Sequence, residues 1–135
     1  MLILRAPDVG DLSRPFWEGC REHELRLQRC LACLRFIHHP ERECPFCHSA
    51  EFRFEAVEGV GVVDTFTEIH RTFVPEYRGA EPYIVGWIAL AGHEIVRMFG
   101  RIVQSSSAQV AIGSPVHVAF DTVPGFGEVP YFVLG

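Results

Sequence analysis

Four cysteines, set out as two C-x-x-C pairs, are the residues of this chain best suited to chemistry. Cys30 and Cys33 form the first pair, Cys44 and Cys47 form the second, and ten residues separate the pairs. Each pair can sit on a tight turn that aims two thiolates at one point, and two such turns complete a tetrahedron of sulfur ligands. The pattern therefore predicts a structural metal site whose four protein ligands leave no open position for catalysis.

Zinc is the metal that this spacing favours, because the chain carries no other redox feature. Iron in a rubredoxin-like site is the second candidate, followed by a dithiol pair and by a ribbon without metal. Leu34 and His48 follow the two pairs, where glycine is usual because a positive φ lets backbone N–H groups point at sulfur. We expect Leu34 to distort the first turn, since histidine tolerates a positive φ better than leucine does.

Three histidines and a fifth cysteine lie near the pairs in sequence. His38, His39 and His48 have the chemistry of metal ligands, but four cysteines already complete a zinc site, so we interpret them as surface or packing residues. Cys20 falls on a predicted helix with no catalytic pattern around it. We expect it to be a half-buried packing residue rather than a nucleophile.

A short helix and a strand must lead the chain into the first pair. Ser13 predicts the cap of a helix that starts near Arg14, with Pro15 in its first turn. Leu25 and Leu27 then alternate with polar residues, as in a short strand that ends at the first cysteine.

From residue 52 onward the pattern is that of strands. The predicted strands cover 59–69, 83–91, 94–103, 115–122 and 131–134, with a hairpin turn at Gly92-His93 and a polar connection over 104–109. About five strands separated by turn signals indicate a small closed or sandwiched β-structure.

Composition limits the class of protein. The chain has 135 residues, 48% of them hydrophobic, enough for one domain or a small domain with an attached module. Its apolar runs are far shorter than the ~20 residues that span a bilayer, and the first run is too short for a secretory signal. We therefore expect a cytoplasmic protein with no membrane partner. A net charge of −5 argues against binding nucleic acid through bulk charge.

The succession of motifs resembles the family of rubredoxin-like zinc ribbons fused to an OB-fold, long called domain of unknown function thirty-five. The matching segments, in family order, are Phe16-Trp17-Glu18-Gly19, Leu27–Cys33, Cys44–Cys47, Gly59–Val63, Pro82–Val85 and Ile112–Val116. The resemblance implies a mainly β fold: an N-terminal helix and a four-cysteine zinc ribbon, followed by a five-stranded OB-fold barrel. We place the arm, helix and first ribbon strand in 1–28, the zinc ribbon in 29–52 and the OB-fold in 53–135.

What the resemblance implies about function is a role in acyl-CoA metabolism. Family members look like non-catalytic subunits that bind acyl-CoA, or dock on and activate a thiolase-fold enzyme. The implied partner is a thiolase or an aldolase acting on acyl-CoA, with steroid side-chain degradation among the candidate pathways and a heterotetramer as the assembly. Some relatives carry a fused hydratase domain, which for this chain we expect to be a separate protein.

Two sets of residues could serve such a role. An acyl-CoA needs cations for its phosphates and aromatic rings for its adenine, and the β-module offers Arg71, Phe73, Arg78, Tyr83, Arg97 and Arg101. A partner needs aromatic anchors, for which the candidates are Phe16, Trp17, Tyr131 and Phe132. The alternatives are solvated strand positions for the arginines, and packing over the ribbon or barrel closure for the aromatics.

Two other functions compete with this interpretation. OB-folds and zinc ribbons often bind single-stranded nucleic acid, although no basic stripe with interleaved aromatics is visible here. An enzyme in its own right would need acid–base groups, for which His70, His93 and His117 are candidates, with Asp64 or Asp121 to orient them. No recognisable catalytic spacing links these residues, so we rank both functions below the accessory subunit.

Overall fold

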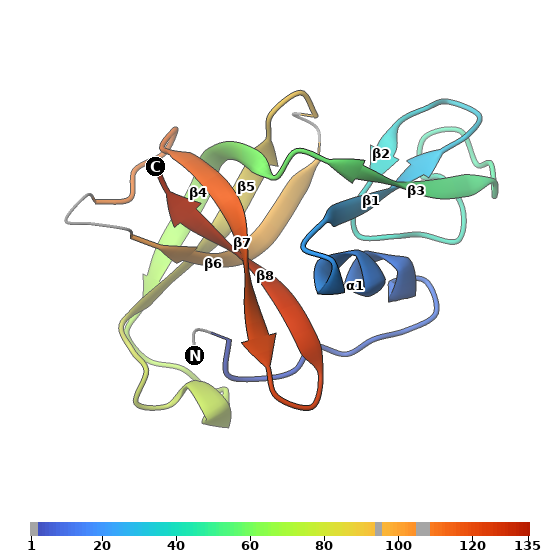
Figure 1. Ribbon diagram of the computed structural model, residues 1–135. Coiled ribbons are helices and arrows are strands. Elements are labelled where there is room, and N and C mark those ends of the chain that lie inside the picture. The colour runs from blue at the N-terminus through green and yellow to red at the C-terminus, as the bar shows by residue number, and fades with distance from the viewer. Residues whose placement is uncertain (1–2, 94–95, 105–108) are drawn as a thin grey trace.

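The structure is a computed structural model that describes residues 3–93, 96–104 and 109–135. A small sheet and a barrel lie side by side, and a short helix packs between them (Figure 1). Helix α1 spans Arg14–Arg21. The small sheet has the order β2-β1-β3, from strands β1 (Leu25–Cys30), β2 (Phe36–Ile37) and β3 (Phe52–Val57).

The barrel is closed by five strands in the order β4-β5-β6-β8-β7. Their bounds are β4 Val60–Ile69, β5 Tyr83–Leu90, β6 Arg97–Val103, β7 Pro115–Val123 and β8 Gly127–Leu134, and a 3-10 turn, Pro75–Tyr77, lies in the β4–β5 connection. All pairings are antiparallel except β6 with β8. The predicted mainly β class, with one short helix, a four-cysteine ribbon and a five-stranded barrel, is confirmed.

Alternation along β5 decides which side chains reach the surface. Ile84, Ile88 and Leu90 join the core, and Val85 and Trp87 lie on the other face of the strand. Gly86 has no room for a side chain, because a Cβ there would lie 2.3 Å from the carbonyl oxygen of Thr65 on β4. The strand thus offers an apolar outer face beside a tightly packed inner one.

One core runs from the barrel through the helix to the ribbon. It includes Phe16 and Cys20 of α1, Leu27 of β1, and Ile88 and Phe132 of the barrel. The helix fills the space between the two sheets and buries its apolar face there. Tertiary packing, rather than intrinsic helix propensity, therefore stabilises it. The two modules share one hydrophobic core and are held together by it.

The ends of several elements differ from the sequence predictions. Ser13 takes the N-cap position, but its hydroxyl bonds to Gly10 and not to a helix N–H. The last strand begins at Gly127 rather than 131, because it pairs with β7 from the turn onward. Residues 94 and 95 of the predicted hairpin and 105–108 of the predicted polar connection lie outside the described residues.

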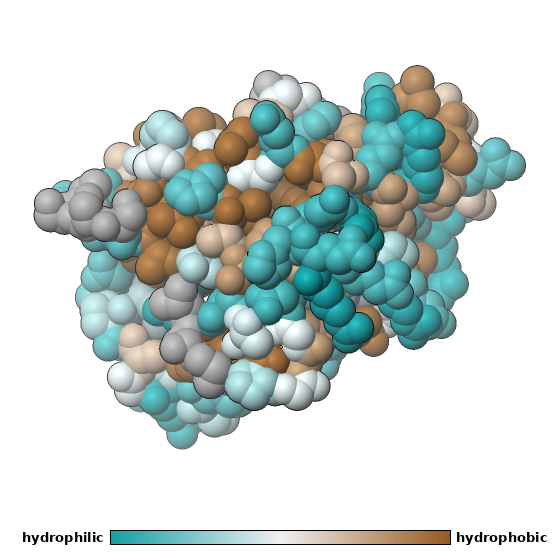
Figure 2. Space-filling view, viewed as in Figure 1, coloured by the Kyte–Doolittle hydropathy of each residue, from teal (hydrophilic) through white to brown (hydrophobic). Residues whose placement is uncertain are grey.

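The surface mixes polar regions with several apolar ones (Figure 2). Trp87 and Phe99 are 39% and 52% exposed on the barrel, and their rings meet edge to face at 5.3 Å. Within the described ranges, no helix has the length and hydropathy needed to cross a membrane.

Candidate metal centre and groove

The four cysteines converge at one end of the small sheet. Their sulfur atoms all lie within 4.8 Å of one another, with 3.5 Å between Cys30 and Cys47 and 3.7 Å between Cys33 and Cys44. A zinc ion with Zn–S bonds of ~2.3 Å at the centre of a regular tetrahedron requires sulfur atoms about 3.8 Å apart. The donor set and its spacing therefore fit one tetrahedral metal ion.

The two cysteine turns have the same backbone geometry. Leu34 and His48 both take a positive φ, 65° and 68°, and their N–H groups donate to the carbonyls of Cys30 and Cys44 at 2.9 Å. The predicted distortion of the first turn is wrong, because Leu34 turns its side chain outward, 53% exposed, and meets no obstacle. In the first turn, the N–H of Cys33 points at the sulfur of Cys30 and lowers the pKa of that thiol to about 6.

Gln28 supports the site in a way that the sequence analysis missed. Its side chain is only 2% exposed, and its amide donates to the carbonyl of Glu41 at 2.8 Å and accepts from the N–H of Glu41 at 2.9 Å. These two bonds tie the segment between the cysteine pairs to β1. The only sequence signal was a polar residue inside a short apolar strand.

The histidines near the cysteines lie outside the sulfur cluster. His48 pairs with Glu43 at 2.9 Å on the surface, and His38 packs its ring 5.5 Å from that of Phe16. In the described ranges, the metal-ligand cluster contains the four cysteines alone.

Cys20 is more buried than the sequence suggested. The structure leaves its side chain 0% exposed, where half-burial was expected, and this burial raises the pKa of the thiol to about 12.

We therefore predict a staged thiol titration. In metal-loaded protein all five cysteines should resist Ellman's reagent, because four are ligands and Cys20 is a buried, protonated thiol. A chelator should expose four thiols, and the fifth should react only after a denaturant is added. Fast reaction of Cys20 in folded protein, checked with Cys20→Ala, would contradict its placement.

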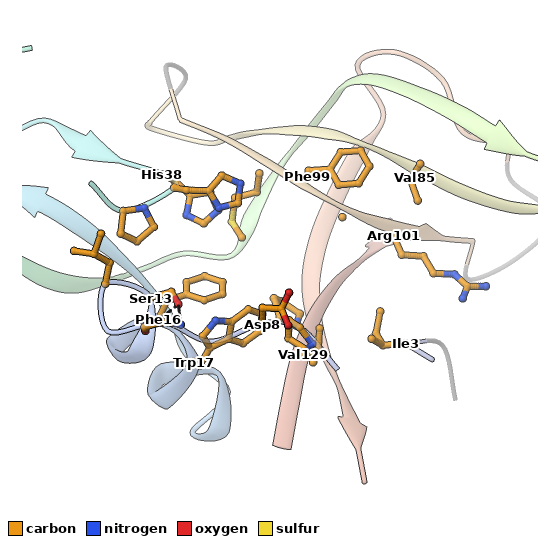
Figure 3. Close-up of a pocket in the computed structure, with 18 of the residues that line it drawn as sticks. Ile3, Asp8, Ser13, Phe16, Trp17, His38, Val85, Phe99, Arg101 and Val129 are labelled. Carbon is orange, nitrogen blue, oxygen red and sulfur yellow. Dashed lines mark hydrogen bonds between the residues drawn. The ribbon is translucent and has the colours of Figure 1, made fainter. Parts of the chain in front are cut away.

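A groove of about 660 Å³ lies between the helix, the ribbon and the barrel. Figure 3 shows α1 with Phe16 and Trp17 on one side, and β5 and β6 with Val85 and Phe99 on the other. The N-terminal arm completes the wall, held by hydrogen bonds from the N–H groups of Ile3 to Asp121 and of Leu4 to Tyr77. The sequence analysis predicted the arm but not its place in the groove wall, since its residues show no periodic pattern.

The structure brings together only part of the predicted acyl-CoA set. Tyr83 and Arg101 line the groove, with the Arg101 guanidinium 5.3 Å from the centre of the Tyr83 ring. The groove wall does not include Arg71, Phe73, Arg78 or Arg97. Phe73 is 83% exposed, and Arg97 pairs with Asp64 at 2.9 Å.

Of the four aromatic residues predicted to dock on a partner, only some line the groove. Phe16 and Trp17 line the groove, and the Trp17 ring also meets the Phe126 ring edge to face at 5.4 Å. Tyr131 packs against the small cluster that holds Val123 and Val129. Phe132 is 1% exposed inside the barrel core and offers no surface to a partner, so packing accounts for this residue.

The candidate acid–base groups are scattered and separately engaged. His70 pairs with Glu68 at 2.8 Å, and His117 bonds to the carbonyl of Gly135 at 3.0 Å. The rings of His93 and Phe36 meet at 4.5 Å. Of the two predicted orienting carboxylates, Asp64 pairs with Arg97, as described above, and Asp121 accepts the N–H of Ile3 at 3.0 Å.

A four-cysteine ribbon joined through a helix to a closed five-stranded barrel defines a zinc ribbon with an OB-fold. Comparison with known families agrees module by module. Residues 17–53 match the family described as "ChsH2, rubredoxin-like zinc ribbon domain", and residues 54–121 match "ChsH2, C-terminal OB-fold domain". The chain therefore belongs to the ChsH2 family of zinc-ribbon and OB-fold proteins, which confirms the resemblance found in the sequence.

Two curated relatives are similar over most of this chain. A "3-oxo-4,17-pregnadiene-20-carboxyl-CoA hydratase alpha subunit" of Mycobacterium tuberculosis is 33% identical over 81% of the chain. A "Probable enoyl-CoA hydratase alpha subunit" of Thermomonospora curvata is 31% identical over 84%. The aligned parts cover 33% and 34% of those proteins, so the chain spans about a third of the length of the relatives it matches.

Two solved structures share the fold. One, described as "Ltp2-ChsH2(DUF35) aldolase", superposes with a TM-score of 0.82 at 24% identity, covering 95% of this chain and 98% of that one. The other is a DUF35-family protein of unknown function from Sulfolobus solfataricus, with a TM-score of 0.66 at 14% identity, covering 94% and 87%. At these identities the likeness concerns the fold alone.

Proposed function

We propose that this chain is a non-catalytic accessory subunit that docks on a thiolase-fold enzyme acting on acyl-CoA. The observation that carries the proposal is membership of the ChsH2 family, with both modules matched in order. Relatives named as hydratase alpha subunits, and an aldolase structure whose description names ChsH2, support a subunit role. The partner we propose is an aldolase or thiolase, with steroid side-chain degradation as the candidate pathway and a cytoplasmic heterotetramer as the assembly.

We propose a non-catalytic role for this chain, with the reaction carried out by its partner. His70 and His117 have separate partners, and the four cysteines leave no open ligand position on a metal. We propose zinc as the resident metal, because four thiolates in a tetrahedron suit it. When bound, zinc would supply folding free energy to the ribbon and no step of a reaction.

Nucleic-acid binding is the second candidate, and one observation favours it. Trp87 and Phe99 form an exposed aromatic pair on an OB-fold face, of the kind on which bases stack. The nearby cation Arg97 is paired with Asp64, and the chain carries a net charge of −5. Because phosphate binding needs clustered cations, we rank this function second.

Affinity purification from the source cells, with mass spectrometry, tests the two candidates. We expect a thiolase-fold protein in near-equal amount with the wild-type chain. Recovery of the chain alone, or with RNA or DNA in a form that resists salt, would contradict the accessory role.

Replacing Trp17 tests the docking surface. Trp17→Ala should reduce the recovered partner at least tenfold, because aromatic anchors commonly contribute about 2 kcal/mol or more at interfaces. Thermal melting of the free chain should move less, since Trp17 is only partly buried. Trp87→Ala is the matched control and should leave recovery unchanged. If Trp17→Ala melts far earlier but still binds the partner, the ring serves only to pack the helix.

A further inference from the structure

The four cysteines of the metal centre differ in how far solvent reaches them. Cys30 and Cys44, the first members of the two pairs, are 0% exposed, and Cys33 is partly buried. Cys47 is exposed, within a run over 45–48 in which every residue is exposed. The end of β1 that carries the first cysteine also lies away from the barrel (Figure 1). A small dissolved reagent therefore reaches Cys47 before the other three ligands.

Cys47 has a sulfur neighbour in the other turn. Its Sγ lies 3.5 Å from the Sγ of Cys30, and the Sγ atoms of Cys33 and Cys44 lie 3.7 Å apart. A disulfide is about 2.0 Å long, so the first two atoms need to approach by only about 1.5 Å to form one. Such a bond would join residues that stand 17 positions apart, one in each turn. It would hold the two turns together as a metal ion does, which a bond within one C-x-x-C pair would not.

We propose that Cys47 is a site of oxidation by hydroperoxides, and that the product is a disulfide with Cys30 that releases the metal while it keeps the ribbon closed. The inference rests on the zinc site proposed above and not on the docking of a partner. Cys20 takes no part, because it is 0% exposed within the core. Hydrogen peroxide is much smaller than Ellman's reagent, so it can reach a ligand sulfur that the larger reagent leaves intact.

The oxidation takes two steps. In the first, the Cys47 thiolate attacks one oxygen of hydrogen peroxide: an S–O bond forms, the O–O bond breaks, and hydroxide leaves. The sulfur gives up two electrons and becomes a sulfenic acid, and the peroxide is reduced. In the second, the Cys30 thiolate attacks the Cys47 sulfur, an S–S bond forms, and the S–O bond breaks with loss of a second hydroxide. Only Cys33 and Cys44 then remain as thiolate ligands, too few for a structural zinc site.

Peroxide treatment of the purified, metal-loaded chain tests the proposal. A chromogenic indicator measures the released metal, and mass spectrometry of alkylated, unreduced protein maps the disulfides. We expect about one metal ion to be released for each disulfide between Cys30 and Cys47, and dithiothreitol with added zinc to reverse the change. Circular dichroism should show more ribbon structure in the oxidised chain than in the reduced, chelated chain, because the disulfide restrains the unfolded ribbon.

A trap for the intermediate identifies the first sulfur that is attacked. Dimedone, added together with peroxide, reacts with a sulfenic acid and marks the residue that carries it. We expect the label on Cys47 of the wild-type chain, with little on Cys33 and none on Cys20. This measurement needs no variant, so it does not depend on how well an altered ligand set folds.

Two histidine variants form a matched pair, since three cysteines and one histidine bind structural zinc as four cysteines do. Cys47→His removes the exposed sulfur and should slow the release of metal by peroxide at least about tenfold. Cys33→His removes a less exposed ligand, so metal should leave at about the wild-type rate, with the disulfide between Cys30 and Cys47 as product. Metal content and melting curves, measured first, identify a variant that fails to load, and dimedone labelling of the wild type then decides alone.

Several results would overturn the proposal: dimedone on another cysteine in place of Cys47, a disulfide within one C-x-x-C pair, or equal rates of metal release from the two variants. A wild-type chain that keeps its metal and all its thiols under peroxide would do the same. If the oxidation fails and a thiolase-fold partner is still recovered, the proposed function stands. If the disulfide forms and no partner is recovered, the oxidation site stands alone.

Discussion

Cys44→Ser should release the metal and unfold the ribbon, while the barrel keeps much of its strand structure. The ribbon has little core of its own: its separate buried cluster holds only Cys30, Ile37 and Cys44, two of them ligands. Structural zinc in comparable modules contributes about 10–16 kcal/mol of apparent binding free energy. Losing one of four thiolates therefore removes most of what holds the segment between β1 and β3 in place.

Metal analysis and circular dichroism measure this outcome. We expect wild-type protein to hold about one metal ion per chain, as a single four-cysteine site requires, and Cys44→Ser to lose nearly all of it. Chelation of the wild type should reproduce the spectral change of the variant. Cys20→Ala is the matched control, because Cys20 is fully buried but is not a ligand, and it should lose some stability yet retain the metal. Full metal content and an unchanged melting curve in Cys44→Ser would refute the metal centre.

The sequence predicted the clustering of the four cysteines well because its signal is local. The four ligands stand in two short turns, so spacing alone indicated which atoms would meet, and the sulfur distances agree. The strands could be predicted equally well, since alternation along the chain indicates which side chains share a face. Leu34 was misjudged because leucine disfavours a positive φ, whereas the folded turn holds Leu34 at a φ of 65° with its side chain 53% exposed.

The groove could not be predicted, because it is assembled from segments far apart in sequence. Arm residues such as Asp8, ribbon residues such as His38 and barrel residues such as Arg101 meet only after the helix packs between the two sheets. The burial of Phe132 could not be predicted for a related reason. A terminal strand rich in apolar residues did not reveal which face would be covered, and pairing with both β6 and β7 places this ring in the core.

Gly86→Ala should destabilise the barrel by about 2–4 kcal/mol, more than overpacking usually costs. A Cβ at this position would lie 2.3 Å from the carbonyl oxygen of Thr65, and 3.0 Å from both the Cα of Phe66 and the Cδ1 of Ile102, so the closest obstacle is backbone rather than a flexible side chain. Relief requires β4 and β5 to move apart beside a bulge that already interrupts their register. Gly10→Ala is the matched control, because a Cβ there meets nothing within 4 Å.

Chemical denaturation, followed by fluorescence, measures the two variants. Gly10→Ala should change the free energy of unfolding by no more than about 0.5 kcal/mol, as expected for an open surface position. Equal stability of the two variants would mean that β4 and β5 do not pair as closely as Thr65 and Gly86 require. The outer face of the barrel, and the groove built on it, would then need a different strand register.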